Sequence, residues 1–133
     1  MATIKSYTDL EQSKKLAEIL PLESADMYYP WYIEEDGDTI ESGHRITTPN
    51  VGNFTTHKVN KMILPCWSLA ALLNVLPTID DRNVVFCKDI RCDKWHVFYH
   101  GTATLPLIDT ERYHDVIDAC VAIIEKLHEL NML

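Results

Sequence analysis

Glycine is scarce in this chain: only four glycines occur among 133 residues, and they do not cluster. Phosphate-binding loops, dinucleotide-binding fingerprints and the serine nucleophile elbow need closely spaced glycines, because the backbone must turn sharply or approach a ligand closely. The sequence therefore excludes these three kinds of enzyme site, and we expect no cofactor.

Basic clusters are also lacking. The formal net charge is -8, and the lysine and arginine residues never gather into a track. A general nucleic-acid binder needs a basic surface to displace counterions from phosphate groups. We therefore expect no direct contact with nucleic acid. An acidic surface of this kind suits a basic protein partner or simply keeps the protein in solution.

Long hydrophobic runs are missing too. No stretch approaches the roughly 20 apolar residues of a membrane span. Residues 1–6 lack the apolar core and cleavage site of a signal peptide. We expect a cytoplasmic protein that does not contact membranes. In that compartment the four cysteines, Cys66, Cys87, Cys92 and Cys120, should be reduced thiols.

The composition is that of an ordinary globular protein. Hydrophobic residues make up 47% of the chain and charged residues 24%, which argues against global disorder. The length fits one domain that can bury a core without metals or disulfides. We expect a single domain over residues 1–133 with a polar, irregular insert at about residues 34–57. That insert is rich in turn-forming residues and has room for a short hairpin.

A nearly all-apolar segment lies between two prolines, Pro65 and Pro77, and has the length of a helix. Proline suits the first turn of a helix and is expelled from its interior, so the pair marks a start and a stop. A segment that is apolar on every side, and too short to span a membrane, predicts the central buried helix of the core.

Two further helices are predicted from capping residues and spacing. Thr8 and Glu11 form a capping-box pattern ahead of an apolar stripe that ends near Leu20, before Pro21. Asp109 is the expected cap of a long final helix, whose apolar residues recur at intervals of three and four. The predicted members of that buried face are Tyr113, Val116, Ile117, Cys120, Ile123, Ile124, Leu127 and Leu130.

β-Branched and aromatic residues predict the strands. Residues 84–90 and 95–101 should form an antiparallel hairpin. Residues 27–33 form an aromatic strand in which Pro30 indicates an edge or a bend, and residues 58–64 form another short strand. The predicted fold class is α+β, with a small antiparallel sheet and about three helices packed mainly on one face.

Four candidate metal ligands lie within the hairpin: Cys87, Cys92, His96 and His100. Thiolates and imidazoles are the ligands that zinc prefers, but their spacing matches no established zinc motif. The two histidines are four residues apart on a strand, which separates their Cα atoms by roughly 13 Å. The sequence therefore predicts no metal site, with these four residues as the candidates to examine.

Cys66 stands next to Trp67 at the start of the predicted central helix, as the nucleophile of papain-type proteases does. A helix N-terminus lowers the pKa of a thiol and would activate it. The likeness covers two residues, and the surrounding glycine and serine signature is missing. Cys66 is the candidate nucleophile of an alternative, thiol-dependent enzyme, while ordinary burial is the expected reading.

Aromatic residues in the segment 27–33 form a candidate binding surface. On a strand, Tyr29 and Trp31 share one face. Tyrosine and tryptophan are favoured anchors at protein interfaces, although they also dominate cores. The sequence names Tyr29 and Trp31 as binding candidates, with the neighbouring insert completing the surface.

Three segments, residues 11–27, 65–77 and 118–133, together resemble a family of small uncharacterised proteins from Bacteroides-type gut bacteria. Members of that family are often encoded in prophages or other mobile elements. The likeness spans most of the chain outside residues 33–56. It implies a shared fold and a phage or mobile-element origin, and it brings no activity, cofactor or catalytic residue.

The leading functional hypothesis is a non-enzymatic, intracellular protein–protein interaction module with an unidentified protein partner. Two alternatives remain open. One is a small thiol-dependent enzyme that uses Cys66. The other is an acidic inhibitor of a basic, nucleic-acid-binding partner, which requires carboxylates arrayed on one face.

Overall fold

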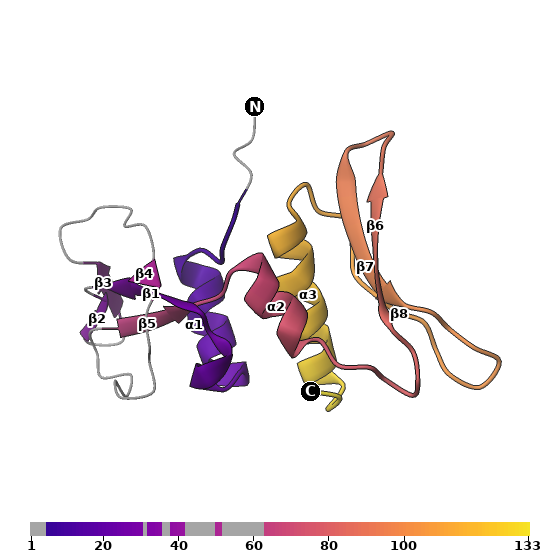
Figure 1. Ribbon diagram of the computed structural model, residues 1–133, viewed down its shortest axis with the longest axis horizontal. Helices are drawn as coiled ribbons and strands as arrows, with labels where there is room; N and C mark the ends of the chain where they lie inside the picture. Colours follow the sequence, from indigo (N-terminus) through magenta and orange to yellow (C-terminus); the bar gives the residue numbers. More distant parts are fainter. Residues whose placement is uncertain (1–4, 31, 36–37, 42–49, 52–62) are drawn as a thin grey trace. The chain divides into compact units, whose positions relative to one another are not determined.

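The computed structural model of the chain describes residues 5–30, 32–35, 38–41, 50–51 and 63–133 (Figure 1). The chain divides into two compact units. The N-terminal unit is Tyr7–Ala71, and the C-terminal unit is Met1–Ser6 with Leu72–Leu133. Two compact units can fold cooperatively or separately, so the expectation of a single domain stays a prediction.

The described residues of the N-terminal unit combine the helix α1 with short antiparallel strands. β1 lies in the middle of the sheet order β4-β1-β5, and it pairs with β5 along its whole length. β2 and β3 form a separate hairpin at the start of the predicted insert. The elements are α1 (Leu10–Ile19), a 3-10 turn η1 (Leu22–Ser24), β1 (Met27–Pro30), β2 (Tyr32–Glu35), β3 (Asp38–Glu41), β4 (Asn50–Val51) and β5 (Ile63–Cys66).

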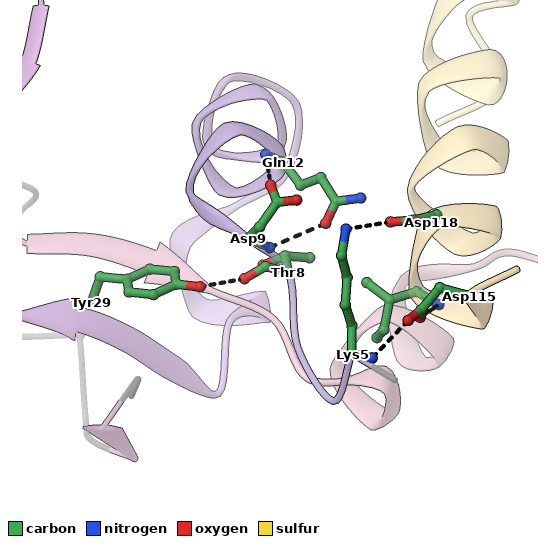
Figure 2. A network of polar contacts seen from close by, with 8 residues as sticks. Lys5, Thr8, Asp9, Gln12, Tyr29, Asp115 and Asp118 are labelled. Carbon is green, nitrogen blue, oxygen red and sulfur yellow. Dashed lines mark hydrogen bonds and ion pairs between the residues drawn. The ribbon is translucent and has the colours of Figure 1, made fainter. Parts of the chain in front are cut away.

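The first helix begins one residue later than the sequence indicates. Its cap is Asp9, whose carboxylate accepts the Gln12 backbone N–H at 2.8 Å, while the Gln12 side chain accepts the Asp9 N–H at 3.1 Å (Figure 2). The predicted capping box from Thr8 to Glu11 is therefore wrong by one position. Thr8 is fully buried, and its hydroxyl accepts the backbone N–H of Trp67 at 3.2 Å instead.

The predicted helix between Pro65 and Pro77 is also wrong in extent and burial. Pro65 belongs to β5, because that strand pairs with β1, and the helix α2 covers only Leu69–Val75. Ser68 precedes it, and the Ser68 hydroxyl accepts the Ala71 backbone N–H at 3.2 Å. One side of α2 reaches solvent, since Leu73 is 43% exposed.

The C-terminal unit packs one long helix on a three-stranded antiparallel sheet, with the strand order β6-β7-β8 (Figure 1). The predicted hairpin is confirmed as β6 (Val84–Asp89) and β7 (Lys94–Tyr99). Asp109 is not a helix cap, because it lies in β8 (Ile108–Asp109) and pairs with β7. The final helix, α3 (Val116–Glu129), is capped by the Asp115 carboxylate, which accepts the Ile117 backbone N–H at 3.0 Å.

α3 is the helix that the core surrounds most completely. Its buried side chains occupy positions on more than one face of the helix, and Ile117, Ile123, Ile124 and Leu127 have no exposed surface. The buried sheet residues of the same unit are Val97, Tyr99 and Ile108. The predicted face is confirmed from Ile117 to Leu127, and Val116 is half-buried. Tyr113 lies before the helix and bridges to Trp95, and Leu130 lies beyond the helix and is 46% exposed.

The segment that opens the C-terminal unit is tied to the first turn of α3. The Lys5 backbone N–H donates to the Asp115 carboxylate at 2.6 Å, and the Lys5 ammonium contacts Asp118 at 2.7 Å (Figure 2). Carboxylates at a helix N-terminus are stabilised by the helix dipole. The two aspartates therefore serve both α3 and the attachment of Lys5.

The α+β fold class is confirmed by the helices and antiparallel strands of the described residues. These strands form separate small sheets rather than the one sheet that the sequence indicates. Among the residues that the structure describes, no helix is long and apolar enough to cross a membrane.

Candidate functional site

β6 is the outermost strand of the C-terminal sheet, and among the described strands it pairs with β7 alone. Backbone bonds made by its neighbour β7 show which groups β6 turns outward. Trp95 and Val97 bond through their N–H and C=O groups to residues 110–113, on the β8 side of the strand. Backbone groups alternate in direction along an antiparallel strand, so His96 and Phe98 face β6.

This alternation defines the β6 edge, the outward backbone groups of Val84, Phe86 and Lys88. Val85 and Cys87 lie directly opposite the β7 residues that face β6, so their own N–H and C=O groups complete the ladder. The residues between them point the other way. Within the described ranges, these outward groups have no backbone partner. The β6 edge therefore presents a row of donors and acceptors to solvent.

Side chains on β6 alternate between the two faces of the sheet. Val84 and Phe86 lie opposite the buried Tyr99 and Val97, on the face that carries the core, and both are half-buried. Val85 is half-buried on the outer face. An extended segment added beside β6 would thus meet apolar side chains on both faces.

The outer face of the sheet carries three rings in a row along β7. The rings of His96 and Phe98 are stacked with centroids 4.9 Å apart, and the His100 ring meets Phe98 edge-on at 5.0 Å. His96 Nε2 lies 3.7 Å from a carboxylate oxygen of Asp109 on β8. These rings support one another through stacking and edge contacts.

The four candidate metal ligands are not brought together. Cys87 lies opposite His96, but the Phe98 ring separates His96 from His100. Cys92 is in the exposed turn of the hairpin. In the described part of the chain, no group of three or more His, Cys, Asp or Glu side chains could hold a metal ion.

Cys66 lies in the core of the N-terminal unit. Its side chain has no exposed surface, and its thiol donates to the Thr8 carbonyl at 3.4 Å. Burial raises the pKa of the Cys66 thiol, although contacts with Thr8 and Ser13 partly oppose this effect. The protonated thiol is therefore favoured, and the geometry offers a substrate no access to the sulfur.

Tyr29 is also a core residue. Its side chain is 5% exposed, packs with Leu64 and Cys66, and donates its hydroxyl to the Thr8 carbonyl at 2.6 Å. Burial raises its pKa well above the usual range, so the phenol stays protonated. Trp31, the other binding candidate, lies outside the described residues.

An acidic turn lies at the N-terminal end of β6. Asp80 and Asp81 have positive φ values of 49° and 62°, in a turn closed by backbone bonds between Ile79 and Arg82. Short polar side chains such as aspartate tolerate this left-handed conformation. Asp80 and Asp81 are both exposed, and Asp80 also lies 3.8 Å from the Arg82 guanidinium. This turn therefore presents two carboxylates to solvent.

A buried arginine holds the acidic turn in place. Arg82 is 8% exposed, and its guanidinium donates to the carbonyls of His100 and Pro106 at 2.6 and 2.8 Å. A buried charge needs such partners, because its desolvation is otherwise costly. The start of β6 is therefore anchored to the loop that follows β7.

The C-terminal end of β6 presents a positive charge. Lys88 pairs with Asp93 at 3.0 Å, and the Arg91 side chain in the hairpin turn is exposed. Among the described residues, no ion pair joins Arg91 to another side chain. The β6 edge thus runs from an exposed carboxylate, Asp81, to an exposed guanidinium.

Sequence patterns did not single out Val84, Phe86 or Lys88 as functional residues. Their importance depends on strand order, since β6 lies at an edge because none of the described strands pairs with its other side. A local pattern of apolar and polar residues indicates which side chains are buried. It does not indicate whether the backbone of the strand is paired on both sides. A sequence signal was available only for the hairpin itself.

Comparison with known proteins assigns no family to this chain. No protein-family model, no curated protein and no solved structure matches it. The resemblance to the Bacteroides-type family therefore stays a prediction.

Proposed function

We propose that this protein is a binding module that acts by contact with another protein chain, and that the β6 edge receives an extended segment as an additional strand. In this mode of recognition the main-chain hydrogen bonds supply affinity, and side-chain contacts on alternate faces supply specificity. An extended protein segment is the occupant whose chemistry matches a row of alternating N–H and C=O groups.

The observation that supports this proposal is the outward orientation of the backbone at Val84, Phe86 and Lys88. Proteins commonly protect an edge strand with proline, a bulge, a covering loop or many charges. β6 contains no proline, and its sequence from Val84 to Phe86 is apolar. An edge of this kind favours association with another strand over a solitary state.

The candidate catalytic side chains support the enzyme hypothesis less well than the β6 edge supports a binding function. Cys66 is buried, and its thiol pKa is raised by that burial. The histidines of the outer face contact Phe98, His96 by stacking and His100 edge-on, rather than converging on one point. A binding function needs none of these groups to react.

The test uses a pair of substitutions at one position. Lys88→Pro removes the outward N–H, while Lys88→Ala removes the same side chain and keeps that N–H. Proline is tolerated where the lost N–H faces solvent, so both variants should fold, as circular dichroism would verify. Tagged wild type and both variants would be isolated from cells that express the protein, and the retained chains, including an untagged copy, would be identified.

The proposal expects at least one chain that wild type and Lys88→Ala retain and that Lys88→Pro loses. The proposal would be contradicted if Lys88→Pro retained every chain that wild type retains, because the binding of those chains would then not use the β6 edge. Retention of no chain, including the protein's own untagged copy, would contradict it as well.

A further inference from the structure

We infer that the turn at residues 90–93, which closes the β6–β7 hairpin, is a second contact with the same partner, and that Ile90 inserts there into an apolar pocket with carboxylates at its rim. This inference rests on the proposed function and adds what the partner protein must carry beside the segment that joins β6. The turn follows β6 directly, and this end of the hairpin projects beyond α3 and β8 (Figure 1). A protein bound along β6 is therefore within reach of the turn.

Ile90 is exposed to an unusual degree. Its side chain is 91% exposed, whereas Leu107, the next most exposed of the large apolar residues described, is 53% exposed. Tight turns favour glycine, proline, asparagine, aspartate and serine, each for a conformational reason that isoleucine does not share. Because a single apolar side chain on a surface is common, the inference depends on how the turn holds Ile90 and on the charges beside it.

The turn is braced on both sides of Ile90. The Asp89 carboxylate accepts the Arg91 backbone N–H at 2.9 Å, and Lys88 pairs with Asp93 at 3.0 Å. Asp93 has a φ of 55°, a left-handed conformation that aspartate tolerates. A loop that is held in one conformation loses little entropy on binding. The contacts that Ile90 makes in a pocket would therefore contribute to affinity with little loss.

Positive charge is in excess at this end of the hairpin. Its two carboxylates, Asp89 and Asp93, already have basic side chains at 3.9 and 3.0 Å. Within the described ranges, no ion pair joins Arg91 or Lys94 to another side chain. Arg91 is exposed and follows Ile90 directly. The complementary surface is thus a pocket that is apolar at its base and acidic at its rim.

A protein pocket fits these observations better than a membrane surface does. The net charge of -8 opposes approach to anionic lipids. Amphipathic segments that lie on membranes present a whole apolar face, and this turn presents one isoleucine. A braced turn also matches a pocket of fixed shape, where a buried apolar anchor supplies much of the binding energy.

The first part of the test measures affinity. A chain that wild type retains and Lys88→Pro loses would be produced separately, and its dissociation constant would be measured by titration calorimetry. Ile90→Asp places a charge where the pocket should be apolar, and Ile90→Val is the matched control that keeps a branched apolar side chain. Arg91→Gln removes the charge beside them. All three positions or their side chains are exposed, so the variants should fold as wild type does.

The second part of the test maps the contact. Cys92 lies in the same turn, and its exposed thiol can carry a benzophenone maleimide. Cys87→Ala removes the other exposed thiol, so the label would mark Cys92 alone. Photocrosslinks to the same chain would be located by mass spectrometry. Vesicles of phosphatidylglycerol would be tested for binding in parallel.

We expect Ile90→Asp to weaken binding about tenfold or more, as loss of a buried anchor does. Ile90→Val should weaken it much less. Arg91→Gln should weaken binding about threefold at low salt and less at high salt, because screening reduces the charge contribution. Crosslinks from Cys92 should reach apolar residues of the partner that have aspartate or glutamate beside them.

A partner that is sensitive to Lys88→Pro and indifferent to Ile90→Asp would overturn this inference and leave the proposed function standing. The absence of crosslinks from Cys92 to that partner would overturn it as well. Binding to phosphatidylglycerol vesicles that Ile90→Asp abolishes would assign the turn to a membrane instead. If no retained chain is sensitive to Lys88→Pro, the proposed function and this inference both fail.

Discussion

β1 and β6 are two apolar strands of the same protein that differ in what surrounds them. β1 lies in the middle of its sheet, with β4 on one side and β5 on the other, and its Tyr29 is 5% exposed. β6 lies at the edge of its sheet, with β7 as its sole neighbour among the described strands. The more aromatic strand, which contains the binding candidate Tyr29, therefore contributes to the core, and β6 keeps a free backbone edge.

The difference teaches that strand order, more than residue type, decides which strand can bind. Aromatic residues serve cores and interfaces equally well, so their presence in β1 does not separate the two uses. A free edge depends on long-range pairing, which local patterns do not report.

The largest expected effect is on the core around β1. Tyr29→Ala should lower the free energy of unfolding by about 3–5 kcal/mol, because it removes a buried ring that packs with Leu64 and Cys66. Phe86→Ala, at a half-buried position of β6, should cost clearly less. Urea denaturation of both variants measures the contrast. Equal losses would show that β6 is as deeply packed as β1.

The next largest loss of stability is expected from Arg82, the residue that anchors the start of β6. Arg82→Met should destabilise the protein by about 2–3 kcal/mol, since it leaves the carbonyls of His100 and Pro106 without their charged donor. Arg112→Met, at an exposed arginine of the same unit, is the matched control and should change little. Thermal unfolding would compare them, and equal stability of the two variants would contradict the anchoring role.

A smaller effect is expected from one buried hydroxyl. Tyr29→Phe keeps the ring and removes the hydrogen bond to the Thr8 carbonyl, so it should cost about 1 kcal/mol. Tyr99→Phe removes an analogous bond to the Pro77 carbonyl in the C-terminal unit and should cost a similar amount. Urea denaturation measures both losses. No loss in either variant would show that these hydroxyls are equally satisfied by water.

A buried thiol should make the stability depend on pH in alkali. Burial raises the pKa of Cys120 from 9.0 to about 12, so above pH 9.0 the unfolded chain releases a proton that the folded protein retains. This contribution to stability is complete below pH 9.0 and is lost as the pH rises toward about 12. Denaturation curves should show a shallower alkaline decline in Cys120→Ala than in wild type. Cys87→Ala, at an exposed thiol, is the control and should decline as wild type does.

Sequence reasoning recovered the elements whose signals are local. The β6–β7 hairpin and α3 follow from β-branched residues and from three-and-four spacing, and both are confirmed. The N-cap of α3 was not predicted correctly. Asp109 is an equally good cap residue, but it lies in β8 and pairs with β7. Asp115 takes the capping position six residues later.

Long-range contacts explain the other differences. The Thr8 hydroxyl accepts the backbone N–H of Trp67, far along the chain, and Asp9 is the N-cap of α1 instead. Pro65 looks like a helix start, but pairing with β1 draws it into β5. The candidate site shows the same limit, since the charges of Asp81 and Arg91 are visible in the sequence and their positions at opposite ends of an edge strand are not.

Backbone hydrogen exchange along β6 is the most direct test of the central claim, measured residue by residue in dilute protein with no partner present. The account predicts an alternation: slow exchange at Val85 and Cys87, whose N–H groups face β7, and fast exchange at Val84, Phe86 and Lys88. When an extended segment is bound at the β6 edge, those three amides should slow. Uniform protection along β6 in the dilute protein, or the opposite alternation, would contradict the assignment of a free β6 edge.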